Sequence, residues 1–311
     1  MARYLTVAVG QLGPVARGER RAPVVRRLIA LMREARAASA ELIVFPEMAL
    51  TTFFPRWPIA DQAELDSFYE TEMPSADTRP LFDEAAHLGI GFYLGYSEKT
   101  SERGGTRRYN SSVFVDRAGR IVGKYRKVHL PGTAGSGERG ATLHLERRYF
   151  DPGDLGFPVW RAFGGIVGMC LCNDRRWPET YRVMALQGVE LIALGYNTPA
   201  RLAEAPEHDH LRDFHNHLPM QAGAYQNTTW VAATAKAGCE EGQDLIGGSC
   251  IIAPTGEIVV QTVTLGDEIA VYRADLDLTL ACRRVNFDFA LYRRPDQYRL
   301  IVERAGAIPP P

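Results

Sequence analysis

The chain has 311 residues, of which 46% are hydrophobic and 23% charged, so it can build a sizeable core and is too apolar for a disordered protein. Its length suits one large domain or two ordinary ones. Lys and Arg number 36 against 37 Asp and Glu, so the chain has no excess of positive charge of the kind that nucleic-acid-binding proteins carry. The longest nearly unbroken apolar stretches, such as 164–172, are far below the ~20 residues of a membrane-spanning helix, so we expect no membrane partner.

The first half of the chain alternates apolar patterns of strand and helix type. Period-two apolar runs predict strands, and apolar residues that recur every three to four positions predict helices. The first hairpin turns at 116–119, because Asp and Gly tolerate the backbone angles of a tight reversal. We expect these elements, in chain order, at residues 4–9, 24–35, 42–45, about 80–88, 91–96 and 111–127.

The second half repeats this order of strand, helix, strand, helix, strand and hairpin. Its elements are expected at residues 166–172, 179–187, 191–194, 218–226, 229–233 and 250–262. The strand runs are mostly apolar on both sides, which favours sheets that are covered on both faces. Two such units predict an α/β fold, a four-layer α-β-β-α sandwich in which two sheets bury one face against each other and carry helices outside.

Two segments lie outside this repeat. Residues 130–158 have little periodicity and much glycine, which is typical of a long connection that helps to form a site. Residues from about 276 to 311 are rich in arginine and aromatic side chains. This tail is a candidate for packing on a neighbouring subunit.

The cysteines and the N-terminus indicate the compartment. The five cysteines are an odd number, and no pair has the CxxC spacing of metal ligands. The N-terminus enters an alternating apolar segment at once, without the charged region, apolar run and cleavage site of an export signal. We therefore expect a reducing, cytoplasmic location.

Three β-type runs each end near a reactive side chain: Glu47, Lys127 and Cys172. Active sites of α/β folds favour such strand ends. A thiol with an ordinary pKa near ~8.5 needs a base or a cation to become a nucleophile, and Glu47 and Lys127 supply one of each. A lone cysteine more often only packs in a core, and Cys170, two residues before Cys172 in the same strand, is expected to do so. The combination favours acyl transfer by a thiol.

The segments that carry these side chains resemble the nitrilase superfamily over nearly the whole chain. LIVFPE ends at Glu47, VGKYRKVHLP contains Lys127, and VGMCLCNDRRWPE contains Cys172, which is the chain order of the Glu-Lys-Cys triad in that superfamily. Within it, the chain most resembles the N-carbamoyl-D-amino acid amidohydrolases, or D-carbamoylases. The segments that carry this finer resemblance are FPEMALTTFFPRW at 45–57, GKYRKVHLPG at 123–132, HLERRYFDPGDLGFPV at 144–159, CNDRRWPE at 172–179, GYNTP at 195–199 and HDHLRDFHNHLPMQAGAYQN at 208–227.

The resemblance implies one carbon-nitrogen hydrolase domain over 1–311, no cofactor and no metal, and a homo-oligomer, dimer or tetramer. It implies that Cys172 is the nucleophile, Glu47 the general base and Lys127 the cation that stabilises the tetrahedral intermediate, with Glu146 as an assisting carboxylate. The implied reaction converts N-carbamoyl-D-amino acids to D-amino acid, ammonia and carbon dioxide through a cysteine-bound carbamoyl intermediate.

The implied substrate is a small molecule with a carboxylate. Arg175 and Arg176 follow the nucleophile, and a guanidinium fork matches a carboxylate with two parallel hydrogen bonds, although adjacent arginines are also common as surface pairs. By resemblance, the other substrate-binding residues are Asn173, Asn197, Thr198, His129 and His144.

Alternative functions stay open at this stage. The histidines within 208–217 could bind a metal, as in metal-dependent amidohydrolases. A different thiol hydrolase, such as a β-ureidopropionase or an aliphatic amidase, is a second alternative, although the RRW after Cys172 favours a substrate with a carboxylate. The loops 133–142 and 200–207 depart from the D-carbamoylase pattern beside the expected pocket, which bears on side-chain preference.

Overall fold

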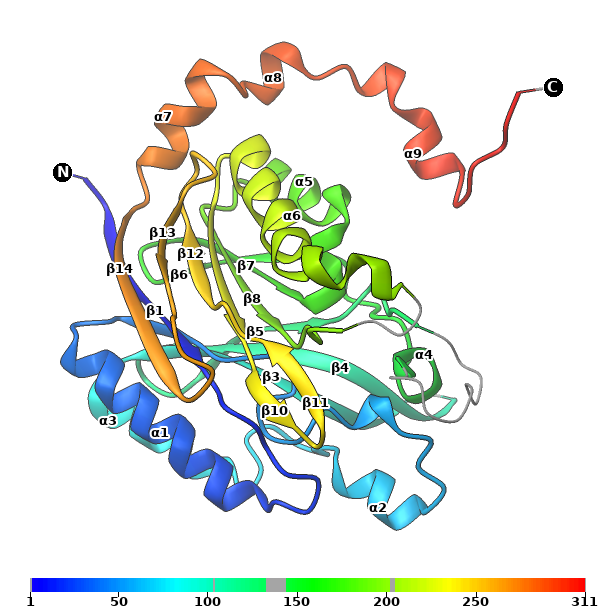
Figure 1. The fold of residues 1–311 in the computed structure, drawn as a ribbon. Helices are drawn as coiled ribbons and strands as arrows, with labels where there is room; N and C mark the ends of the chain where they lie inside the picture. The colour runs from blue at the N-terminus through cyan, green and yellow to red at the C-terminus, as the bar shows by residue number, and fades with distance from the viewer. Residues whose placement is uncertain (1, 103, 133–143, 202–204, 311) are drawn as a thin grey trace.

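The computed structural model describes residues 2–102, 104–132, 144–201 and 205–310. Two six-stranded mixed sheets lie face to face, as the α-β-β-α prediction requires (Figure 1). The first sheet, in the order β14-β1-β2-β3-β4-β5, contains β1 (Tyr4–Gln11), β2 (Leu42–Val44), β3 (Gly91–Glu102), β4 (Gly105–Val115), β5 (Ile121–Arg126) and β14 (Glu268–Asp275). The second, in the order β13-β12-β9-β8-β7-β6, contains β6 (Val159–Ala162), β7 (Gly165–Leu171), β8 (Leu191–Tyr196), β9 (Trp230–Ala235), β12 (Cys250–Ile252) and β13 (Ile258–Gln261).

Helices cover the outer face of each sheet, so the predicted four layers are confirmed (Figure 1). The helices on the first sheet are α1 (Arg21–Ala37) and α3 (Arg79–Leu88), and those on the second are α5 (Pro178–Leu186) and α6 (Arg212–Asn227). The other helical elements before the C-terminal tail are short: η1 (Phe54–Arg56), α2 (Gln62–Ser67), α4 (Glu146–Tyr149), η2 (Cys172–Arg176) and η3 (Pro206–Leu211). None of the helices in the described ranges has the length and apolar character that crossing a bilayer requires.

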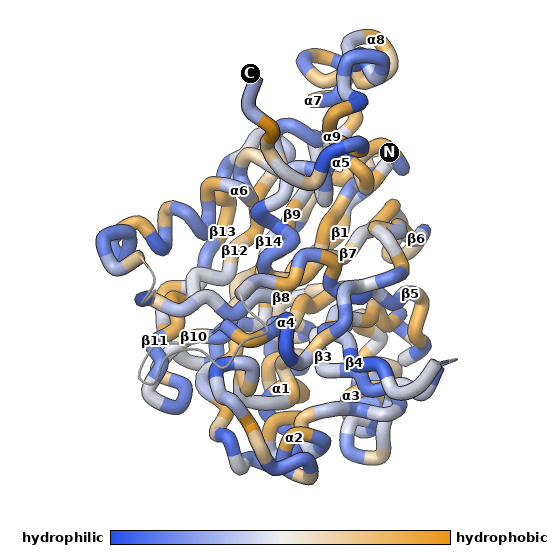
Figure 2. The backbone as a smooth tube through the Cα atoms, turned by 90° about the vertical axis from the view of Figure 1, so that its right-hand side faces the viewer, coloured by the Kyte–Doolittle hydropathy of each residue, from blue (hydrophilic) through white to orange (hydrophobic). Residues whose placement is uncertain are grey.

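The core follows from the alternation of side chains along each strand. In β1, Val7 and Val9 belong to the apolar cluster that also holds the second sheet and the buried sides of α5 and α6, whereas Ala8 belongs to the cluster under α1, with Val24 and Leu28. Successive residues of a strand point to opposite faces, so one apolar strand supplies both layers. Figure 2 shows the resulting apolar colouring along the central strands.

Some elements differ from the sequence expectation. The β3–β4 hairpin pairs as far as Glu102 with Gly105, well beyond the strand expected at 91–96. Strand β14 was not expected, and it pairs antiparallel with β1 along its whole length. A small ladder of β10 (Ala237–Glu240) and β11 (Gln243–Ile246) was also not expected. The long connection expected at 130–158 includes α4, and its residues 133–143, like 202–204 of the other divergent loop, lie outside the described residues.

The C-terminal tail arches away from the body of the sandwich (Figure 1). It consists of α7 (Leu278–Val285), α8 (Phe289–Tyr292), η4 (Pro295–Gln297) and α9 (Arg299–Glu303). Large apolar side chains of this segment are exposed, Val302 at 86% and Leu291 at 67%. A cavity of about 600 Å³ lies between the tail, α5 and the C-terminal end of α6.

Candidate active site

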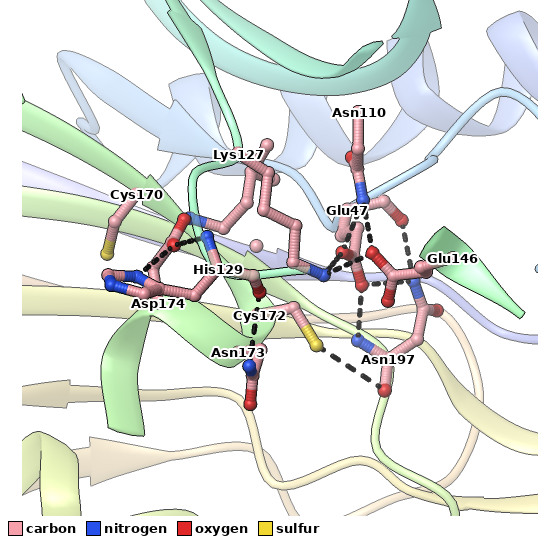
Figure 3. A network of polar contacts seen from close by, with 12 residues as sticks. Glu47, Asn110, Lys127, His129, Glu146, Cys170, Cys172, Asn173, Asp174 and Asn197 are labelled. Atoms are coloured by element: carbon pink, nitrogen blue, oxygen red, sulfur yellow. Dashed lines mark hydrogen bonds and ion pairs between the residues drawn. The ribbon is translucent and has the colours of Figure 1, made fainter. Parts of the chain in front are cut away.

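The three predicted reactive side chains meet where strands of both sheets end (Figure 3). Glu47 follows β2, Lys127 follows β5 directly, and Cys172 follows β7 directly. Strands β2 and β7 each run parallel to a neighbour in their own sheet, and the carboxyl ends of such strands commonly hold ligand sites. The fold therefore brings together residues that lie far apart in the sequence.

Lys127 lies between two carboxylates. Its Nζ donates to Glu47 Oε1 at 2.8 Å and to Glu146 Oε2 at 2.6 Å, and all three side chains are fully buried. Asn110 Nδ2 donates to the same two carboxylates, at 2.8 Å to Glu47 and 3.3 Å to Glu146. An isolated buried charge is costly, so this hydrogen-bonded cluster is what allows one ammonium and its carboxylates to stay inside.

The Cys172 thiol lies beside this cluster. Its Sγ is 3.8 Å from the backbone oxygen of Asn197, and the Asn197 Nδ2 donates to Glu47 Oε2 at 3.1 Å. The backbone at Cys172 has a φ of 43°, a left-handed value that costs energy for a non-glycine residue and is typical of functional turns. The thiol thus stands at the first residue of η2, on a sharp turn out of β7.

Burial and neighbouring charges separate the protonation states of the thiol and the base. Burial and the Glu47 charge raise the pKa of the Cys172 thiol, and Lys127 and Arg175 oppose this only in part. Burial would also raise the pKa of Glu47, but the Lys127 ammonium and hydrogen bonds from Lys127, Asn110 and Asn197 hold it below its ordinary value. The resting site therefore pairs a neutral thiol with an ionised carboxylate, the starting state for general-base catalysis.

The second carboxylate behaves differently. Burial, together with the nearby Glu47 charge, raises the pKa of Glu146 to about 7, although Lys127 opposes the change. Burial lowers the pKa of Lys127, but the Glu146 and Glu47 charges outweigh this and raise it. Burial and the Lys127 charge lower the pKa of His144 to about 4, so this imidazole is neutral near pH 7. The site thus combines a permanent cation, a carboxylate and a second carboxyl that titrates near neutrality.

The two arginines after the thiol have different surroundings. Arg175 is buried, and its Nη1 donates to the Cys172 backbone oxygen at 2.5 Å and approaches the thiol at 3.6 Å. Its Nη2 donates to Thr198 Oγ1 and Asn216 Oδ1, each at 2.7 Å. Arg176 is accessible as a residue, but the protein around its charged group removes part of the hydration, and this desolvation and the Arg175 charge lower its pKa to about 10. Arg175 therefore holds the turn of Cys172 to Thr198, which follows β8, while Arg176 is the more accessible of the two arginines.

His129 and Asn173 lie on the other side of the thiol's turn. His129 Nδ1 is 2.8 Å from Asp174 Oδ1, and its ring stacks on Trp177 at a centroid distance of 4.9 Å. Asn173 Nδ2 donates to the His129 backbone oxygen at 3.1 Å. These contacts join the segment after Lys127 to the nucleophile's turn (Figure 3).

Several buried polar atoms at the site have no hydrogen-bond partner among the described residues. They are Glu146 Oε1, Asn197 Oδ1, Asn110 Oδ1, His144 Nδ1 and Arg175 Nε. Buried polar groups in proteins are normally paired, so such atoms indicate places for a polar ligand or water. Three of the five are acceptor oxygens, which suit a ligand that carries N–H donors.

Sequence reasoning missed three residues of this arrangement: Asn110, Asp174 and Asn216. Asn110 is a polar residue within the otherwise buried part of β4, and Asn216 is a buried polar residue on the inner face of α6. Asp174 stands inside the quoted CNDRRWPE motif. A polar residue at a buried position of a strand or helix is the signal that could have found the first two.

The histidines of 208–217 do not converge with other ligands. His217 Nε2 lies 3.2 Å from the Gly248 backbone oxygen, and its Nδ1 lies 3.4 Å from Asp213 of the same helix. Across residues 2–102, 104–132, 144–201 and 205–310, no three His, Cys, Asp or Glu side chains are placed to hold a metal ion together. The metal alternative thus has no geometric support in this part of the chain.

Comparison with known proteins places this site in a family. The model of the carbon-nitrogen hydrolase family matches residues 6–284. An N-carbamoylputrescine amidase of Arabidopsis thaliana is 29% identical over 89% of this chain and 89% of its own length. A nitrilase of Pyrococcus abyssi is 31% identical over 82% and 84%, and a citrullinase of Francisella tularensis is 29% identical over 85% and 87%.

Solved structures share the fold. The crystal structure of a carbon-nitrogen hydrolase from Helicobacter pylori superposes with a TM-score of 0.83 at 23% identity, covering 97% of this chain and 99% of that one. A nitrilase-superfamily member from Saccharomyces cerevisiae superposes with a TM-score of 0.74 at 19% identity, over 95% and 97%. The resemblance to the nitrilase superfamily is confirmed, and the chain belongs to the carbon-nitrogen hydrolases, enzymes that act on amide-type C–N bonds.

Proposed function

We propose that this enzyme hydrolyses N-carbamoyl-D-amino acids to the D-amino acid, ammonia and carbon dioxide. The observation that carries the proposal is the thiol of Cys172 beside the buried Glu47–Lys127–Glu146 cluster, with the arginine pair directly after it. Relatives named as acting on N-carbamoylputrescine support a carbamoyl group as the reacting centre. The CNDRRWPE and GYNTP segments, which resemble D-carbamoylases, support the D-amino acid part.

The reaction begins with proton transfer and attack. Glu47 takes the proton of the Cys172 thiol as sulfur bonds to the carbamoyl carbon, and the ammonium of Lys127 stabilises the negative charge on the former carbonyl oxygen. Collapse of the tetrahedral intermediate breaks the bond to the terminal nitrogen, which leaves as ammonia with the proton returned by Glu47. The amino acid then remains attached to Cys172 through the carbonyl carbon.

Hydrolysis completes the cycle. A water molecule gives a proton to Glu47 as the water oxygen attacks the carbonyl carbon bound to sulfur. The carbon–sulfur bond then breaks, and the proton on Glu47 restores the thiol. The released carbamic acid breaks down to the amino acid and carbon dioxide. One carbamoyl compound and one water thus give one amino acid, one ammonia and one carbon dioxide.

The surroundings of the thiol support a ureido substrate with a carboxylate. The unpartnered oxygens of Glu146, Asn197 and Asn110 suit the N–H groups of a carbamoyl group. Arg176 is an accessible residue of the same turn, and its guanidinium fork matches the substrate carboxylate. Asn173, Thr198, His129 and His144 complete the pocket, with Arg175 holding Thr198 in place.

The deciding experiment measures ammonia release from matched N-carbamoyl-D- and N-carbamoyl-L-amino acids, with N-carbamoyl-β-alanine and a simple amide alongside. The proposal expects release from the D compounds only, insensitive to chelator and lost in Cys172→Ala. Release from N-carbamoyl-β-alanine or the amide instead would assign a β-ureidopropionase or an aliphatic amidase with the same thiol chemistry. Chelator-sensitive release would contradict the thiol mechanism and favour the histidines of 208–217.

The enzyme works as a homo-oligomer in which the tail contacts a second copy of the chain. The exposed apolar side chains of α9 and the cavity beside α5 and α6 support this arrangement. Val302→Asp, at a side chain that is 86% exposed, should lower the mass measured by light scattering. Val263→Asp, equally exposed at 88% but in the turn before β14, is the matched control and should keep the mass. Equal masses for all three proteins would contradict the proposed contact.

The location is the cytoplasm. All five cysteines are free thiols, and one of them, Cys239, is exposed. Exposed free thiols persist where the compartment is reducing. Fractionation of the producing cells tests this location, and recovery outside the cytoplasm would contradict it.

A further inference from the structure

Asp174 is a buried carboxylate that joins the segment of Cys172 to the segment of Lys127. Its Oδ2 accepts from the Tyr125 hydroxyl at 2.7 Å, and its Oδ1 accepts from the His129 backbone N–H at 2.9 Å. Tyr125 stands two residues before Lys127, and His129 stands two residues after it. Asp174 itself stands two residues after Cys172, so one side chain holds both flanks of the lysine to the nucleophile's turn.

The same carboxylate fixes the turn that carries the thiol. Its Oδ2 also accepts from the Leu171 backbone N–H at 3.1 Å, directly before Cys172. A φ of 43° at Cys172 persists only where the surrounding contacts hold it. Asp174 supplies such a contact on one side, and the Arg175 hydrogen bond to the Cys172 backbone oxygen supplies another.

We propose that Asp174 is a positioning residue that sets the separation of Cys172 Sγ and Lys127 Nζ by holding their two segments together (Figure 3). A misplacement of roughly 1 Å at an active site can cost about 100-fold in rate. The carboxylates of Glu47 and Glu146 hold the lysine head from other segments. The inference rests on the thiol chemistry of the proposed function but not on the identity of the substrate.

Asparagine cannot replace this carboxylate. Each oxygen of Asp174 accepts from a backbone N–H, Oδ1 from His129 and Oδ2 from Leu171. Whichever way an amide lies at this position, its NH₂ group faces one of these donors, so one segment loses its hold. Asp174→Asn therefore releases one side of the clamp and keeps the volume of the side chain.

The experiment compares Asp174→Asn with the wild-type chain by two rates. One is kcat for the carbamoyl substrate, and the other is the rate at which iodoacetamide alkylates Cys172, followed on its own peptide by mass spectrometry because Cys239 is exposed. We expect kcat to fall about 100-fold with little change in KM. We also expect slower alkylation of Cys172, since Lys127 and Glu47 no longer meet the thiol correctly.

Glu190→Gln is the matched control. Glu190 is a buried carboxylate whose Oε2 accepts from the Ile166 backbone N–H at 2.8 Å, near the start of β7, whereas Cys172 follows the other end of that strand. It also pairs with Arg3 at 2.6 Å. We expect Glu190→Gln to lower Tm, as Asp174→Asn does, but to keep kcat and the rate of Cys172 alkylation at their wild-type values. If kcat falls equally in both variants, the effect is one of general stability and the positioning role is wrong.

Wild-type kcat and wild-type alkylation in a folded Asp174→Asn protein would overturn the proposal. Should that variant not fold, Tyr125→Phe gives the answer by the same two rates, because it keeps the carboxylate and removes one contact. Slower alkylation in Tyr125→Phe supports the clamp, and an unchanged rate overturns it. Alkylation needs no substrate, so a wrong substrate leaves this test intact, whereas full activity of Cys172→Ala would contradict the proposed function itself.

Discussion

The Nζ of Lys127 lies 2.6 Å from Glu146 Oε2, closer than its 2.8 Å contact with Glu47. Lys127 is thus shared between two carboxylates that are both out of contact with water. Two carboxylates around one cation leave one negative charge in excess. Burial and the Glu47 charge favour protonation of Glu146, whose pKa is raised to about 7, and this protonation removes the excess while Glu47, with a lowered pKa, stays ionised.

The raised pKa of Glu146 predicts a loss of stability with rising pH. Between pH 4.5 and about pH 7 the Glu146 carboxyl keeps its proton in the folded chain, whereas the unfolded chain has lost it. The contribution of Glu146 to the free energy of unfolding is therefore fully present below pH 4.5 and is lost as the pH rises through about 7. The free energy of unfolding then falls by at most about 1.4 kcal/mol per pH unit. Glu146→Gln cannot titrate and should flatten this slope in denaturant unfolding. Glu240→Gln is the control, because the pKa of Glu240 is lowered and the slope should remain.

Removing the shared cation should damage both stability and activity. Lys127→Met leaves the Glu47 and Glu146 carboxylates buried without their partner, which costs about 3–5 kcal/mol for a broken buried pair. Lys124→Met, three residues earlier, removes a half-exposed partner of Glu98 and should cost less than about 1 kcal/mol. Urea unfolding measures both, and equal losses would contradict the buried charge cluster. Activity should disappear only in Lys127→Met.

The two neighbouring arginines should respond differently to the same substitution. Arg176→Lys should raise KM about 10-fold or more and leave Tm unchanged, since an exposed fork to a carboxylate is lost. Arg175→Lys should lower Tm and kcat, because one ammonium cannot span the Cys172 oxygen and Thr198 hydroxyl together. Steady-state kinetics with thermal unfolding separates the two. An unchanged KM in Arg176→Lys would remove Arg176 from substrate binding.

Cys170, in β7, and Cys172, directly after β7, provide a matched pair of substitutions. Cys172→Ala should abolish ammonia release while the fold persists, because no other group can form the carbamoyl bond. Cys170→Ala should keep the activity and cost about 1 kcal/mol of stability, since Cys170 is buried and burial raises the pKa of its thiol far above the ordinary range. Loss of activity in both variants would point to the strand rather than to the nucleophile.

Most of the sandwich could be predicted from the sequence because its strands and helices follow clear apolar periods. Helix α1, for instance, buries the residues whose three-to-four spacing predicted it, from Val24 to Ala35. Strand β14 was missed because its alternation becomes a strand only through pairing with β1, at the other end of the chain. Such long-range pairing is a tertiary property and leaves little local trace.

The site was predictable to the extent that chemistry fixes residue type. Glu47, Lys127 and Cys172 each follow a strand, as their motifs indicated, and the fold brings them together. The clamp by Asp174 and the contacts of Arg175 were not predictable, because hydrogen-bond partners depend on which atoms burial brings within reach. For this reason two adjacent arginines that look alike in the sequence have different surroundings.

The pairing of β1 with β14 also sets when the molecule can finish folding. Tyr4 lies opposite Asp275, so β1 cannot pair with β14 until the long stretch of chain between them has been synthesised. Until then β1 offers an unpaired edge, which is a template for joining other chains. Contacts so distant in the sequence close late, and domains of this size pass through states that aggregate easily. A nascent chain stalled before Glu268 therefore keeps this edge of its first sheet open to pairing with other chains.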